Sequence, residues 1–203
     1  MRSIEKKIRS LLFSSSKETQ DLGWLLDKSQ NHGRVKQALE VEHADLLHQT
    51  ASRAIEELLL ATHIVCNQKN TTQIHVKNLP NVRSLSCQKH HQLRNFHISN
   101  CPNLTYLYCC NNDHLNQLNV EQCPSLIYLS CVNNQLNQLQ IEAPLLTHLY
   151  ATSNHLSHFD LSPYHKLFGL DFTKNPLQTL KMTPLQKTTL RPSLETFTQI
   201  IAV

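Results

Sequence analysis

The chain has 203 residues, with 19 Lys and Arg against 15 Asp and Glu, and a formal net charge of +4. A chain of this length can bury a hydrophobic core without disulfides or metals. Only 3 Gly residues are present, which argues against Gly-rich phosphate loops and Rossmann-type turns. The 7 Cys residues are odd in number and form no paired CxxC units, so we expect neither a disulfide framework nor a zinc ribbon. This Cys usage favours a reducing, cytoplasmic compartment.

Charge is distributed unevenly along the chain. From Leu104 to His165 there is no Lys or Arg, and the acidic residues there are Asp113, Glu121, Glu142 and Asp160. Because phosphate contacts need Lys and Arg, we expect no nucleic-acid partner along this stretch. No apolar run is long enough to cross a membrane, and charges occupy the place of a secretory apolar stretch. We therefore expect no membrane anchor and no cleavable signal.

Residues 1–60 show helical spacing of apolar residues and are predicted to form a helical N-terminal cap. A first short helix carries Ile4, Ile8, Leu11 and Leu12. The sequence Ser15-Ser-Lys-Glu18 matches a capping box before a second helix, which carries Leu22, Leu25 and Leu26. A longer helix is expected from about Arg34 to Leu60, with inward side chains Val35, Ala38, Leu39, Leu46, Ala51, Ile55, Leu58 and Leu59.

A short repeat dominates residues 61–182. Its clearest copy runs from Leu126 to Ile141 and follows the pattern LxxLxCxxNxLxxLxI. Copies begin near residues 61, 82, 104, 126, 146 and 167, so successive starts are 21, 22, 22, 20 and 21 residues apart. A Pro falls two residues before four of these starts, at Pro80, Pro102, Pro124 and Pro144. So small a drift in spacing is typical of insertions in the turns of a repeat protein.

The repeat predicts a stack of parallel strands. In a strand, alternate side chains face opposite ways, so the fourth and sixth residues of LxxLxC point inward and the third, fifth and seventh point outward. Six copies at about 4.8 Å per strand give a concave face on the order of 25 to 30 Å long. Residues 183–203 are predicted to close the far end with a short helix over Arg191 to Ile201, which packs through Leu194, Phe197 and Ile200.

Two repeat places are assigned structural roles. The ninth place holds Asn112, Asn134, Asn154 and Asn175, which we expect to hydrogen-bond the backbone where the chain leaves the strand. His90 and Lys69 replace this Asn in the first two copies, which predicts a looser turn there. The sixth place holds Cys66, Cys87, Cys109 and Cys131, which are predicted to pack inward as small hydrophobes. Cys101 and Cys123 form a second equivalent pair with the same packing role.

These nested repeats resemble the leucine-rich-repeat family, specifically the bacterial variety of about 21 residues with alternating LxxLxC and LxxLxL halves. The resemblance covers residues 61–182 and implies an α/β solenoid with a curved parallel sheet of about six repeats, an N-terminal helical cap and a short C-terminal one. Short-repeat proteins of this kind are familiar among effectors that intracellular bacterial pathogens deliver into host cells. The resemblance therefore implies such an origin and a place in the host cytoplasm.

The outward places of the sheet predict a binding surface. Four of the 5 Tyr residues lie there, on a surface almost without charge. Aromatic residues favour strands in general, but this preference does not explain their concentration at outward places, which is typical of an interface core. The outward places of the other half-repeat, such as Asn116, Gln138 and Gln140, are predicted to be solvated. The predicted partner-binding residues are Tyr106, Tyr108, Cys110, Tyr128, Ser130, Val132, His148, Tyr150, Thr152 and Asp171.

No catalytic, metal or cofactor site is predicted. Cys110 lies at an outward place, but a nucleophile needs a positioned base and no motif ties a Cys to a His here. The sequence Cys87-Gln-Lys-His90-His91 has residue types that bind metals, but its Cys is expected to point inward. We therefore expect the chain to be no enzyme.

The sequence supports three functional hypotheses. The favoured one is a monomeric, protein-binding module that occludes a host or bacterial partner, because repeat proteins of this family are known to inhibit enzymes by enfolding them. The second is an adaptor that recruits host ubiquitin-ligase machinery through its N-terminal helices. The third, a ubiquitin-ligase-type enzyme, is disfavoured because residues 183–203 contain no Cys.

Overall fold

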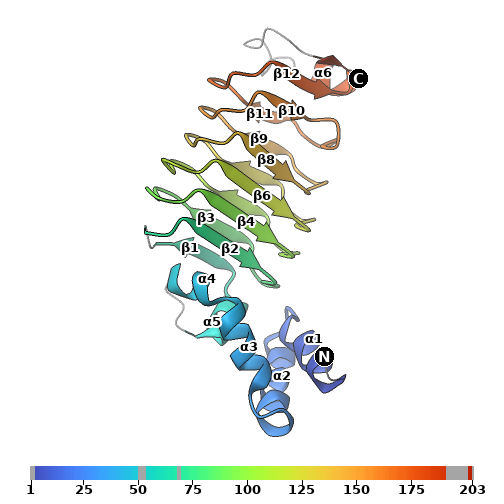
Figure 1. Cartoon of the computed structure of the whole chain (residues 1–203). Coiled ribbons are helices and arrows are strands. Elements are labelled where there is room, and N and C mark those ends of the chain that lie inside the picture. Colours follow the sequence, from blue (N-terminus) through green and yellow to red (C-terminus); the bar gives the residue numbers. More distant parts are fainter. Residues whose placement is uncertain (1–2, 50–53, 68–69, 191–200, 203) are drawn as a thin grey trace.

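The computed structural model describes residues 3–49, 54–67, 70–190 and 201–202. Repeated turns of chain stack into a parallel β-solenoid of about six turns, with helices at one end and a short helix at the other (Figure 1). The predicted solenoid with helical caps is confirmed.

The first half of each repeat forms one unbroken sheet. Its six parallel strands follow one another in the order β1-β3-β5-β7-β9-β11. The register places the same repeat position of each turn side by side, as in the pairs Ile64–Leu85, Leu85–Leu107 and Leu107–Leu129. The strands are β1 (His63–Cys66), β3 (Ser84–Cys87), β5 (Tyr106–Tyr108), β7 (Tyr128–Ser130), β9 (His148–Tyr150) and β11 (Gly169–Asp171).

The second half of each repeat also forms strands. Only one sheet, from the first half, was expected from the sequence. Apolar residues two apart in LxxLxI fit the two-residue period of a strand as well as LxxLxC does. These strands make a second face in two parts, β2-β4-β6-β8 and β10-β12-β13, and no ladder joins β8 to β10. They are β2 (Gln73–Lys77), β4 (Asn95–Ser99), β6 (Gln117–Glu121), β8 (Gln138–Ile141), β10 (His158–Asp160), β12 (Thr179–Met182) and β13 (Ile201–Ala202).

The core between the two faces consists of stacked columns of apolar side chains. The predicted inward column of Cys66, Cys87, Cys109 and Cys131 is confirmed, since all four are buried free thiols. Hydrogen bonding to the neighbouring thiol, together with burial, raises the pKa of Cys66. Cys101 and Cys123 are buried as well, which agrees with the packing role predicted for them.

The buried Asn residues form the predicted ladder. The Asn134 Oδ1 atom accepts from the Asn112 backbone N–H at 2.8 Å, and its Nδ2 donates to the Cys109 and Cys131 carbonyls at 2.7 and 2.8 Å. The prediction of a looser turn at His90 is wrong, because this residue is fully buried and its Nε2 lies 3.2 Å from the Cys66 carbonyl. The imidazole thus reproduces the bond that the Asn112 amide makes to the Cys87 carbonyl at 3.2 Å. Lys69 lies outside the described residues.

The N-terminal cap differs in detail from its prediction. Instead of one long helix from Arg34 to Leu60, the described residues of this range form three, and α3 ends at Glu42. The next residue, the C-cap His43, has its ring 3.1 Å from the Leu39 carbonyl and 2.9 Å from that of Lys77. This side chain joins the end of α3 to the first turn of the solenoid. Ala38 is exposed, and Ala51 lies outside the described residues. The helices are α1 (Ser3–Leu12), α2 (Lys17–Gln30), α3 (Arg34–Glu42), α4 (Ala44–Gln49) and α5 (Ile55–Leu60).

The fully buried positions of helix α2 are not its leucines, although Leu26 is half-buried and packs against the core. Its N-cap is Ser16, one residue after the predicted Ser15, and its buried residues are Gln20, Gly23 and Asp27. Asp27 accepts from the backbone N–H groups of Val35 and Lys36 at 3.1 and 2.8 Å, and so stabilises the start of α3. Leu22 and Leu25 are therefore left 48% and 61% exposed.

One carboxylate connects the cap to the solenoid. Glu42, at the end of α3, pairs with Arg9 at 3.2 Å and accepts from the Asn78 side chain at 2.6 Å, while Lys77 lies 3.7 Å away. Burial by itself raises the pKa of Glu42, but hydrogen bonds from Arg9 and Asn78 hold it below its ordinary value. Helix α4 packs against β1 and β2 and covers the first turn.

The far end is closed by α6 (Pro184–Thr189), which begins with a capping box between Thr183 and Gln186. The buried Gln186 amide donates to the Leu161 and Tyr164 carbonyls at 2.7 and 3.1 Å. Residues 191–200 of the predicted C-terminal helix lie outside the described residues, and Ile201, expected to be helical, is in strand β13. In the described part of the chain, no helix is long and apolar enough to cross a membrane.

Candidate functional site

Six rings lie together on the outer side of the first sheet. Tyr128 is at the centre, with its ring centroid 5.3 Å from that of Tyr108 and 5.7 Å from those of Tyr150 and His148. Tyr106 lies 6.3 Å from Tyr128. We call this cluster the tyrosine surface; it consists of Tyr106, Tyr108, Tyr128, His148, Tyr150 and Phe168.

The strand register explains why these rings meet. Tyr106, Tyr128 and His148 are paired neighbours at the third place of their repeats. At the fifth place the small Ser130 stands between Tyr108 and Tyr150, and the Tyr128 ring packs against both tyrosines. Ser130 is therefore only 9% exposed, and Cys110 covers it further, with its Sγ 3.2 Å from the Ser130 Oγ. Because the strands are parallel and in register, the third and fifth places of neighbouring repeats together form one continuous layer of aromatic side chains.

Phe168 belongs to the tyrosine surface but was not predicted from the sequence. Its ring makes an edge contact with His148 at 4.5 Å between centroids, and the side chain is 59% exposed. Gly169 makes this packing possible, since a Cβ there would lie 2.4 Å from the His148 Cδ2 and 3.1 Å from the Tyr150 Oη. One signal in the sequence could have predicted this contact. When the six repeats are aligned, Gly169 is the only Gly at the third place, and Phe168 directly precedes it.

The remaining predicted site residues lie at the margin of the tyrosine surface. Val132 and Thr152 are half-buried at the seventh place. Asp171 neighbours Tyr150 in the register, and its Oδ1 accepts from the Thr173 backbone N–H at 2.8 Å. Burial alone raises the pKa of Asp171, but hydrogen bonds from Thr173 and Thr152 hold it below its ordinary value. Asp171 thus adds a single negative charge at one margin.

Tyr128, at the centre of the cluster, keeps its hydroxyl proton at neutral pH. Burial, and then the neighbouring Tyr108 and Tyr150 hydroxyls, raise the pKa of Tyr128. Tyr106 is the most exposed of the four tyrosines at 42%, and the other three are half-buried. The surface therefore offers ring faces and tyrosine hydroxyl groups to a partner, with no Lys, Arg, Asp or Glu among its six residues.

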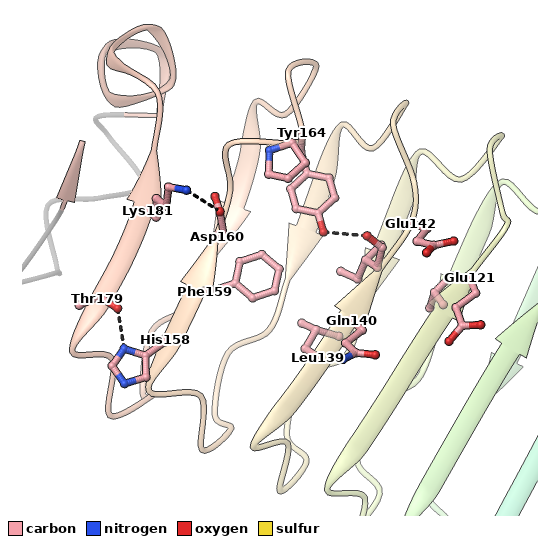
Figure 2. A pocket seen from close by; sticks show the side chains of 13 residues that line it. Glu121, Leu139, Gln140, Glu142, His158, Phe159, Asp160, Tyr164, Thr179 and Lys181 are labelled. Atoms are coloured by element: carbon pink, nitrogen blue, oxygen red, sulfur yellow. Dashed lines mark hydrogen bonds and ion pairs between the residues drawn. The ribbon is translucent and has the colours of Figure 1, made fainter. Parts of the chain in front are cut away.

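The second face contains a groove where its ladder is interrupted. The groove has a volume of about 730 Å³ and is lined by residues of β6, β8, β10 and β12. Figure 2 shows the Phe159 ring in the gap between β8, which carries Leu139, and β10. From the sequence, this face was expected to carry solvated amides, and the groove was not predicted.

Two stacked rings form the apolar wall of the groove. Phe159 and Tyr164 lie 6.1 Å apart between centroids, with their planes at 12°. The Tyr164 hydroxyl donates to the Ile141 carbonyl at 2.9 Å and so bridges the interruption (Figure 2). Burial raises the pKa of Tyr164 to about 12. The rim carries Glu121, Glu142, Asp160 and Lys181.

Neither surface has the residues of a metal site. Within residues 3–49, 54–67, 70–190 and 201–202, no group of three or more His, Cys, Asp and Glu side chains could hold a metal ion. Cys87, His90 and His91, which have metal-binding residue types, are separated, since Cys87 and His90 are buried while the His91 Nδ1 is 2.6 Å from Asp113 at the surface.

No model of a protein family, no curated protein and no solved structure matches this chain. The resemblance to leucine-rich repeats therefore rests on the repeat pattern, and the structure shows a parallel β-solenoid.

Proposed function

We propose that the chain is a protein-binding module that acts by covering a partner with its tyrosine surface and has no catalytic activity of its own. The observation that carries this proposal is the cluster of six touching rings on the unbroken six-stranded sheet. Tyr-rich, charge-poor surfaces are typical of interface cores.

The physical properties of the surface support binding by occupancy. Each aromatic ring brings a large contact area with few rotatable bonds, so little conformational entropy is lost when a partner covers it. The rings also stand on a hydrogen-bonded ladder of parallel strands, which holds them in fixed positions. A partner of complementary shape would meet a surface that is already ordered.

The biological setting is a further part of the proposal. We infer a leucine-rich-repeat effector of an intracellular bacterium, which works as a monomer in the host cytoplasm and inhibits or regulates a host or bacterial partner enzyme. The repeat pattern supports the family, and seven free thiols support a reducing compartment. The chain is proposed to bind neither nucleic acid nor a membrane, because residues 104–165 carry no Lys or Arg.

Affinity capture from host-cell lysate, read out by mass spectrometry, tests the proposal. The test variant changes Tyr106, Tyr108, Tyr128 and Tyr150 to Ala, and the matched control changes four amide residues of the second face to Ala, namely Asn116, Gln117, Asn137 and Gln138. Circular dichroism must show that both variants are folded. The tyrosine variant is expected to lose a partner that the wild type and the control retain. Equal capture of every wild-type partner by the tyrosine variant would contradict the proposal.

A second candidate, an adaptor that recruits ubiquitin-ligase machinery through its N-terminal helices, is supported by exposed apolar side chains on the cap. Leu22, Leu25 and Val41 are 48%, 61% and 79% exposed on α2 and α3. Substituting Leu22 and Leu25 by Gln leaves the buried side of α2 intact and should abolish recruitment of a ligase subunit if the cap binds one. Tyrosine-surface partners should then still be captured.

A further inference from the structure

The interruption of the second face exposes strand edges in the middle of the solenoid. In the intact parts, the first residues of a strand donate to the preceding turn, as Gln138 N–H does to the Asn116 carbonyl at 3.3 Å and Thr179 N–H to Ser157 at 3.2 Å. Within the described residues, His158 makes no such bond to Asn137. The backbone edges of β8 and β10 are therefore free to pair with another strand over this stretch.

The opening is confined to one face. On the opposite side, β7 and β9 remain paired, and the His155 backbone N–H still donates to the Leu136 carbonyl at 2.9 Å. The two turns are thus stacked at the first sheet and separated only around the groove of about 730 Å³. This volume is within the range of roughly 300 to 1,000 Å³ that is typical of ligand sites.

The charges around the groove favour a cationic occupant. Its lining contains three carboxylates, Glu121, Glu142 and Asp160, and one ammonium group, Lys181, which is already paired with Asp160 at 3.1 Å. The Glu142 carboxylate accepts from the Gln122 backbone N–H at 3.1 Å and has no cationic partner among the described residues. Residues 104–165 supply no Lys or Arg that could neutralise it. Lys181 is the one Lys or Arg among the lining residues, and the His97 Nε2 lies 3.5 Å from Glu121, so Glu142 is the carboxylate left without an ion-pair partner in the described part of the chain.

The apolar wall fits the stem of a long basic side chain. The stacked rings of Phe159 and Tyr164 lie between Asp160 on one side and Glu142 on the other (Figure 2). Lys and Arg lay their aliphatic stems on apolar surface while the charged head stays polar, and they are attracted to aromatic faces. A small inorganic cation would use the carboxylates but neither the rings nor the strand edges.

We propose that this groove binds an extended, basic segment of a partner protein, which adds to the free edges of β8 and β10 as a strand and places Lys or Arg side chains against Glu121 and Glu142. Strand addition supplies main-chain hydrogen bonds, and the carboxylates select for charge. The site is separate from the tyrosine surface and does not depend on it.

Fluorescence anisotropy with the full chain and a labelled peptide of alternating Lys and Val tests the proposal. Two comparison peptides have Glu in place of Lys, or Pro in place of every second Val at unchanged charge. The Lys peptide is expected to bind, the Glu peptide not to bind, and the Pro peptide to bind about tenfold more weakly because it lacks backbone donors. Absence of binding by the Lys peptide, or equal binding by the Pro peptide, overturns the proposal.

Paired charge variants separate the groove from general electrostatic attraction. The double variant Glu121→Gln with Glu142→Gln should weaken binding of the Lys peptide about tenfold. The matched variant Asp113→Asn with Glu40→Gln removes the same charge elsewhere and should leave the affinity within about twofold. An equal loss in both variants would mean that the groove is not the site. Changing the four tyrosines of the tyrosine surface should not affect this peptide, so failure here and failure of the proposed function are distinguishable.

Discussion

The two faces of the solenoid come from the two halves of one repeat, yet one is continuous and the other is interrupted. On the first sheet, aromatic side chains point outward and pack on each other without disturbing the ladder. On the second face, two large rings, Phe159 and Tyr164, meet beside the unpaired edge of β8. Aromatic rings on the outer side of the first sheet leave its strand pairing intact. Where two rings meet in the corner of one turn, the backbone hydrogen bonds between β8 and β10 are missing.

The column that contains Tyr164 shows where the difference originates. The residue three places before each repeat start is Leu79, Cys101, Cys123, Ala143 and then Tyr164, all of them buried. Phe96 occupies the same strand position as Phe159, but its turn has the small Cys101 in the corner, and β4 stays paired with β6. We infer that the combination of two rings in one turn, rather than either ring alone, opens the ladder.

The largest effect is expected from breaking the Asn ladder that both faces share. Asn134→Ala removes the acceptor of the Asn112 N–H and the donor to two carbonyls, all of them buried. The free energy of unfolding, measured by urea denaturation, should fall by about 2 to 3 kcal/mol, because buried polar groups are left without partners. The exposed Asn137→Ala is the control and should change it by less than about 0.5 kcal/mol. Similar losses in the two variants would show that the ladder is not structural.

A smaller effect, limited to the first sheet, is expected for Gly169→Ala. The new Cβ would approach the His148 Cδ2 to 2.4 Å, so the imidazole has to leave its place between Tyr128 and Phe168. Overpacking of this kind should cost about 1 to 2 kcal/mol, and the NMR shifts of the His148 ring should move. Binding of the Lys peptide to the second face should not change. Unaltered His148 shifts would mean that the ring does not depend on Gly169.

Tyr164→Phe should destabilise the second face alone, by about 1 kcal/mol, because the hydrogen bond to the Ile141 carbonyl is lost. Burial raises the folded-state pKa of Tyr164 to about 12. The contribution of Tyr164 to the free energy of unfolding is therefore present below the ordinary tyrosine pKa near 10 and is lost as the pH rises toward 12. Denaturation between pH 9 and 12 should therefore show a steeper loss in the wild type than in Tyr164→Phe. Parallel pH profiles would contradict this assignment.

The smallest effect is expected at the junction with the cap, where Glu42→Gln should cost less than about 1 kcal/mol. The folded-state pKa of Glu42 is lowered. The contribution of Glu42 to the free energy of unfolding is therefore present above the ordinary pKa of 4.5 and is lost as the pH falls through the lowered pKa. The stability difference between wild type and variant should therefore disappear at low pH, as thermal melts between pH 2 and 7 can measure. A difference that persists at pH 2 would assign the effect to packing and not to charge.

The sequence by itself determined the repeat, the inward and outward places, the Asn ladder and the position of four tyrosines on one sheet. These features follow from two periods in the sequence, the two-residue alternation of a strand and the repeat of about 21 residues. Tertiary structure decided the rest. The single helix expected after Arg34 ends where His43 reaches the Lys77 carbonyl, and Leu22 and Leu25 of α2 face outward while Asp27 is buried at the start of α3. Likewise, Phe168 joins the tyrosine surface because His148 packs over Gly169, and the groove exists because β8 and β10 do not pair beside Tyr164. Each of these outcomes depends on contacts between residues of different helices, strands or turns, which the residue pattern of one element cannot specify.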